Sequence, residues 1–197
     1  MKTNRLCARL VVLGLLSGAL DGATPPITVR LVNSAKVPNK IVLAGEEKAA
    51  RVLAQAGIEV EWLDCSGGEV GPCAVPLRPG EFWLHVANWR PAGTTPEDLG
   101  FVALAPDSET GASLAGVYYP MVREMAAHDR MEEEPILAAV LSHEIGHLLG
   151  EGHSPTGIMC PRFNRQRIVD MAQGGLLFAR DQAARMRAAI ARRRTGR

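Results

Sequence analysis

The stretch HEIGHLLGEGH, residues 143–153, contains three of the five histidines in this 197-residue chain. His143 and His147 are four residues apart in a segment whose apolar residues predict a helix. Side chains with this spacing lie on the same face of a helix, so both imidazoles can reach one metal ion. We therefore expect the stretch to build a metal site.

Three further residues of the stretch complete the pattern. Gly150 allows the chain to leave the helix sharply, because glycine adopts positive φ without steric cost. The turn then returns His153 to the same point as a third ligand. Three imidazoles leave the fourth position of a tetrahedral zinc ion open, which is typical of a catalytic site. Glu144 is positioned to act as general base on a water at that open position.

These residues match the metzincin pattern H-E-x-x-H-x-x-G-x-x-H at every fixed position. The chain thus resembles the metzincin-type zinc metallopeptidases, and the pair His153 and Ser154 is similar to the matrixin branch. Metzincins place a methionine in a tight turn beneath the metal, and the resemblance assigns this role to Met159. Two features depart from the family: the Met159 spacing is shorter than in matrixins, and Cys160 stands where some metzincins have tyrosine.

The matrixin resemblance also implies a substrate strand and a specificity pocket. In matrixins an edge strand above the cleft pairs with the bound peptide through main-chain hydrogen bonds. The stretch LAGVYYP is similar to that strand, which makes the expected substrate residues Ala115, Gly116, Val117 and Tyr118. The candidates for the pocket wall follow the methionine and are Arg162, Phe163 and Asn164.

Hydrophobic periodicity predicts eight secondary-structure elements. The predicted strands cover residues 27–32, 58–63, 82–86, 101–105 and 115–119, and the predicted helices cover 43–56, 133–149 and 177–194. Residues 101–105 are apolar enough to lie at the centre of the sheet. The order of elements is similar to that of metzincins. It implies an α+β, zincin-like fold in which a twisted, mixed five-stranded sheet packs on the active-site helix, with a C-terminal helix after the Met-turn.

The N-terminus has the pattern of a secretory signal peptide. Three basic residues precede an apolar run at residues 10–20, and Ser17 and Ala19 give the small-x-small pattern of a cleavage site. We expect residues 1–23 to be removed, which leaves 24–197 as a single catalytic domain that is secreted or periplasmic. A retained anchor is the alternative, although the run is short for a membrane span of about 20 residues.

The cysteines are consistent with export. Cys65 and Cys73 bracket a glycine-rich loop, and an oxidising compartment favours a disulfide between them. Cys160 is then left as either a buried thiol or an intermolecular partner.

Charge is distributed unevenly along the chain. Residues 24–161 contain 9 basic and 18 acidic residues, a net charge of −9, whereas residues 162–197 contain 10 basic and 2 acidic residues, a net charge of +8. Such a tail can attach to an anionic surface or polymer. We favour the simpler interpretation, a solvated arginine-rich helix.

Together these features predict a secreted, monomeric endopeptidase with one catalytic zinc ion and Glu144 as its base. Its partner would be a peptide or protein, with no role for nucleic acid, and a calcium requirement is left open. One alternative is a zinc amide hydrolase that acts on cell-wall peptides, which the basic tail would suit. Another is a secreted zinc-binding module without activity.

Overall fold

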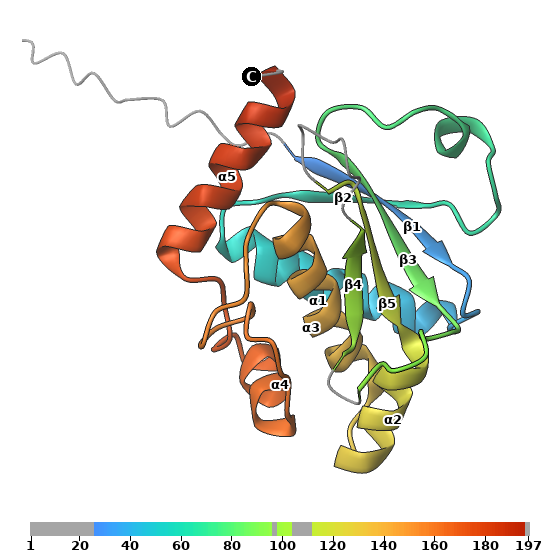
Figure 1. The fold of residues 1–197 in the computed structure, drawn as a ribbon, viewed down its shortest axis with the longest axis vertical. Helices are drawn as coiled ribbons and strands as arrows, with labels where there is room; N and C mark the ends of the chain where they lie inside the picture. Colours follow the sequence, from blue (N-terminus) through green and yellow to red (C-terminus); the bar gives the residue numbers. More distant parts are fainter. Residues whose placement is uncertain (1–25, 96–97, 104–111, 196–197) are drawn as a thin grey trace, which may run out of the picture.

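The computed structural model describes residues 26–95, 98–103 and 112–195. The predicted signal peptide, residues 1–23, lies outside these ranges. Within them, one sheet contains five strands: β1 (Ile27–Asn33), β2 (Val60–Asp64), β3 (Glu81–Ala87), β4 (Gly100–Ala103) and β5 (Leu114–Tyr118). The order across the sheet is β2-β1-β3-β5-β4. Neighbouring strands are parallel from β2 to β5, whereas β4 is antiparallel to β5 (Figure 1).

Five α-helices accompany this sheet in the described part of the chain. They are α1 (Asn39–Gln55), α2 (Tyr119–Asp129), α3 (Glu133–Leu148), α4 (Arg165–Ala172) and α5 (Arg180–Thr195), and a short 3-10 helix covers Gly71–Ala74. The predicted α+β architecture, a mixed five-stranded sheet packed on helices, is confirmed. Among the described helices, none is long and apolar enough to cross a membrane.

The core lies between the sheet and the paired helices α1 and α3 (Figure 1). Alternate residues of β3 point into it, and Phe82, Leu84 and Val86 are all fully buried. The two helices approach closely, because a Cβ built on Gly45 of α1 would lie 3.0 Å from Leu137 of α3. Since α3 is buried on nearly all sides, it is a rigid base for the histidines that it carries.

The prediction of a central strand at residues 101–105 was wrong. β4 is the outermost strand of the sheet in the described residues, and all four of its residues are half-buried. The apolar composition suggested burial on both faces. The strand order instead places β4 beside β5, and its other edge has no neighbour among the described strands. Residues 104 and 105 of the predicted strand lie outside the described residues.

The sequence analysis did not predict two of the helices, α2 and α4. Helix α2 begins directly after β5, with Pro120 in its first turn, where a missing N–H costs nothing. Helix α4 is only eight residues long and buries only Ile168 and Met171, so its periodicity is weak. Its one clear signal is Asn164, whose side chain caps the helix by accepting a hydrogen bond from the Arg167 N–H.

The arginine-rich C-terminal helix is not simply solvated, as the favoured interpretation had it. Arg187, Arg193 and Arg194 of α5 donate hydrogen bonds to backbone carbonyls of the main body. Arg185 forms ion pairs with Glu151 and Asp181. Much of the positive charge thus serves to attach α5 to the domain.

Candidate metal centre

Helix α3 brings the first two predicted ligands together. His143 and His147 are one turn apart, and their Nε2 atoms are 2.9 Å from each other. Two imidazoles on a tetrahedral zinc ion have nitrogens about 3.3 Å apart, given the usual zinc–nitrogen bond length. The observed separation is close to that value, so the pair fits a shared metal ion.

The third predicted ligand arrives through the turn that ends α3. Gly150 has a φ of +91°, its N–H donates to the carbonyl of His147, and the Glu151 N–H donates to the carbonyl of Gly146. This is the Schellman pattern of helix termination. It reverses the chain, so that a ligating nitrogen of His153 lies within 4.8 Å of those of the other two histidines.

Backbone carbonyls fix the tautomers of two ligands. The Nδ1 atom of His143 is 2.8 Å from the carbonyl oxygen of Ile158, and that of His147 is 2.7 Å from the carbonyl oxygen of Glu151. A carbonyl can only accept a hydrogen bond, so each Nδ1 must carry the proton. The Nε2 lone pairs are then left facing the common point, as metal ligation requires.

Burial keeps these imidazoles in the form that binds metal. Burial lowers the pKa of His143 to about 4, and it also lowers the pKa of His147. Both rings are therefore neutral at physiological pH. Neutral imidazole is the ligating species.

The predicted base, Glu144, is a buried carboxyl at the same site. Its Oε2 atom is buried and has no hydrogen-bond partner among the described residues, and burial raises its pKa to about 8. The side chain lines a cavity of about 150 Å³ together with all three histidines. An unpartnered carboxylate oxygen beside three ligating nitrogens suits a group that binds and deprotonates a water.

Met159 lies against the ligand helix. The Cys160 N–H donates to the carbonyl of Gly157 at 3.2 Å, which closes a tight turn around Ile158 and Met159. Met159 is fully buried, and a Cβ built on Gly146 would overlap its sulfur atom. The turn therefore packs against α3 at Gly146, between the two ligand positions, and the Met-turn role of Met159 stays a prediction.

Comparison with known proteins bears on the fold. No protein-family model matches the chain, and no curated protein matches it at significance. Among solved structures it is similar to archaemetzincin from Methanopyrus kandleri, with a TM-score of 0.54 and 15% sequence identity over 88% of this chain and 99% of that one. The fold is metzincin-like. The comparisons lend no support to the matrixin branch in particular.

Within this metzincin-like fold, the predicted substrate strand is not at an edge. Residues Ala115, Gly116, Val117 and Tyr118 belong to β5, which is hydrogen-bonded to β3 on one side and to β4 on the other. A strand with two neighbours has no free backbone groups to offer a peptide. The predicted edge position of residues 115–118 was therefore wrong, and β4 is the edge strand of the described sheet.

The cavity wall agrees in part with the predicted residues. Phe163 lines the cavity, with its ring centroid 5.5 Å from that of His143. Arg162 is exposed, and Asn164 caps α4. The sequence analysis did not identify Asp98 and Gly100, which also line the cavity and belong to no motif that could have identified them.

A larger hollow of about 920 Å³ lies between α1, α2 and the start of α3. None of its lining residues is a histidine or a cysteine, and its Glu133 is bonded to Tyr119. The smaller cavity holds the three clustered histidines and the buried Glu144, so we place the functional site there.

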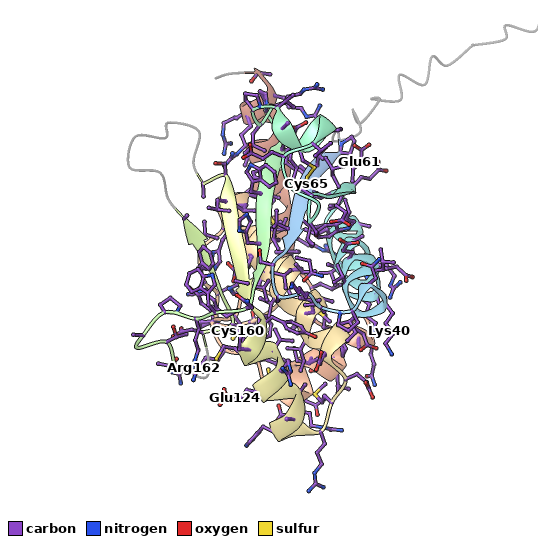
Figure 2. All side chains as sticks on the ribbon, turned by 90° about the vertical axis from the view of Figure 1, so that its right-hand side faces the viewer. Lys40, Glu61, Cys65, Glu124, Cys160 and Arg162 are labelled. Atoms are coloured by element: carbon purple, nitrogen blue, oxygen red, sulfur yellow. A yellow bond between two sulfur atoms is a disulfide. The ribbon has the colours of Figure 1, made fainter. Side chains whose placement is uncertain are left out.

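The structure joins Cys65 and Cys73 in a disulfide. Cys160 is a buried free thiol beside Arg162, well away from that bond (Figure 2). Its sulfur lies 3.8 Å from the carbonyl oxygen of Pro155. Burial disfavours the role of intermolecular partner, which the sequence had left open.

Proposed function

We propose that this chain is a zinc-dependent endopeptidase. The observation that carries the proposal is the single cavity lined by His143, His147, His153 and Glu144, on a metzincin-like fold. The three histidines would hold one zinc ion, and the Nε2 atoms of His143 and His147 already carry no proton, because their Nδ1 atoms face carbonyl oxygens. A zinc ion bound there supplies Lewis acidity, which polarises a carbonyl group and makes a water molecule more acidic.

Glu144 would act as the general base that accepts a proton from the attacking water. Burial raises the pKa of Glu144, so its ionised form is a stronger base than an ordinary carboxylate, and a cation held by the neighbouring histidines would favour that ionised form. The same group can then donate that proton to the departing amine. Among the described residues, the one other carboxyl that lines the cavity is that of Asp98, which accepts hydrogen bonds from the Thr95 N–H and hydroxyl.

β4 would bind the substrate backbone. It is the outermost strand of the described sheet, and its Gly100 lines the cavity beside Glu144. A peptide that adds to this edge would run past the three histidines and be held by main-chain hydrogen bonds. Side-chain preference would then come from the wall around Phe163.

We also propose that the protein is exported and acts outside the cytoplasm as a monomer. The basic and apolar pattern of the first 23 residues supports export, as does the disulfide between Cys65 and Cys73. We expect the signal peptide to be cleaved between residues 19 and 23. Mass spectrometry of the exported protein would identify the bond that is cut.

The decisive experiment is digestion of a diverse peptide library by the purified protein. A chelated sample and the Glu144→Ala variant are run in parallel. We expect cleavage by the zinc-loaded wild type and a loss of about 100- to 10,000-fold in Glu144→Ala, which should keep its zinc. An equally active Glu144→Ala enzyme would exclude Glu144 as the base. A folded, zinc-loaded wild type that cleaves no peptide would favour the wall-directed hydrolase or the inactive binding module.

A further inference from the structure

Glu151 is a main-chain component of the candidate metal centre. It lies between the second and third ligands in the sequence, and its N–H closes α3 by donating to the carbonyl of Gly146 at 3.0 Å. Its own carbonyl oxygen is 2.7 Å from Nδ1 of His147. The position of the Glu151 backbone therefore sets the orientation of the His147 ring.

The Glu151 side chain is held from the other side by Arg185. The carboxylate is only 4% exposed, and both of its oxygens accept hydrogen bonds from the guanidinium, from Nε at 2.9 Å and from Nη2 at 2.7 Å. A two-pronged contact of this kind fixes the direction of the carboxylate as well as its distance. A buried carboxylate that lost this partner would move towards water.

Arg185 projects from a well-anchored helix. Met186 and Ile190 of α5 are fully buried, and Arg187 donates to the carbonyl of Ala56 at 2.6 Å. Arg185 is also fixed within α5, since its Nη1 is 2.8 Å from the Asp181 carboxylate. The guanidinium is thus presented to Glu151 in a defined position.

We propose that Arg185 and Glu151 are positioning residues for the zinc site. Arg185 holds the Glu151 carboxylate, the Glu151 carbonyl holds Nδ1–H of His147, and His147 presents Nε2 to the metal. The C-terminal helix would in this way stabilise the ligand geometry from 34 residues further along the chain. The inference rests on the zinc site of the proposed function.

The test compares zinc affinity in two variants of one helix. Arg185→Met removes the contact to Glu151, whereas Arg187→Met removes a contact between α5 and the body that does not involve the ligand loop. Zinc dissociation constants are measured on the full chain by competition with a chromophoric chelator. We expect a 10- to 100-fold weaker affinity for Arg185→Met, the size usual for residues that support metal ligands. Arg187→Met should stay within about twofold of wild type, given its distance from the ligands.

Further measurements separate this role from general stabilisation. In the zinc-loaded protein, the Nδ1 proton of His147 should exchange with water faster in Arg185→Met than in Arg187→Met. If Arg185→Met does not fold, Arg185→Lys replaces it as the test variant. Lysine keeps the positive charge but cannot donate the two parallel hydrogen bonds to Glu151, so this variant should still bind zinc more weakly than wild type. Wild-type affinity in a folded Arg185 variant would overturn the positioning role and leave the proposed function intact. A wild-type protein that binds no zinc would overturn both.

Discussion

At the scale of single residues, Gly100 has no room for a side chain. A Cβ built there would lie 2.5 Å from Oε1 of Glu144 and 2.7 Å from the carbonyl oxygen of Gly116. We expect Gly100→Ala to displace the carboxylate and lower kcat/KM by about 100-fold, the effect typical of a misplacement near 1 Å. Zinc content should not change, because no ligand is touched.

The control for Gly100→Ala is Gly67→Ala, at an open position in the disulfide loop with nothing within 4 Å of the added Cβ. Steady-state kinetics and metal analysis on both variants make the comparison. A Gly100→Ala enzyme with wild-type kcat/KM would mean that Glu144 does not need its observed position.

His153 offers a second prediction at this scale. We expect His153→Ala to weaken zinc binding by more than about 100-fold, which exceeds the effect of residues that only support ligands. Metal competition at fixed pH measures the change. The matched control is His128→Ala, because His128 is exposed on α2 and paired with Asp129. Unchanged zinc affinity in His153→Ala would remove it from the ligand set.

At the scale of the element, α1 carries a carboxyl that opposes folding at neutral pH. Burial, with a smaller contribution from Asp64, raises the pKa of Glu46 from 4.5 to about 7. The unfolded chain therefore ionises this group first as the pH rises. The neutral Glu46 carboxyl contributes its full stabilisation of the folded state below pH 4.5, and this contribution is lost as the pH rises through about 7.

Glu46→Gln should abolish this loss. We expect its free energy of unfolding to match that of wild type near pH 4 and to exceed it at pH 8 by up to about 3 kcal/mol. Urea denaturation at the two pH values gives both differences. Glu47→Gln, at an exposed position of the same helix, should differ from wild type by less than about 0.5 kcal/mol. Equal effects of the two substitutions would argue against a buried Glu46.

At the scale of the whole molecule, α5 connects parts of the domain that are distant in sequence. Arg193 donates to the carbonyls of Ala112 and Leu148, and its guanidinium lies 4.9 Å from the centre of the Phe82 ring. We expect Arg193→Ala to lower the free energy of unfolding by about 2–3 kcal/mol through lost hydrogen bonds and packing. Its exposed neighbour provides the control, and Arg192→Ala should change stability by less than about 0.5 kcal/mol. Denaturation curves that coincide for the two variants would mean that the α5 contacts contribute little.

The candidate metal centre could be predicted from the sequence because its residues lie close together along the chain. His143 and His147 fall on one helical face by periodicity alone, Glu144 lies one position further around the helix, and Gly150 marks the turn towards His153. The strands at β1, β2 and β3 were predicted for the same reason, since each alternates along a short run.

Tertiary structure decided everything that depends on neighbours in space. Only the strand order makes β4 the edge and buries β5 between two partners. Only the packing of α5 brings Arg185 to Glu151. A single sequence records which side chains alternate or repeat along an element, because that is a property of the local chain. It does not record which elements meet, because contacts between distant segments are selected by the free energy of the whole fold.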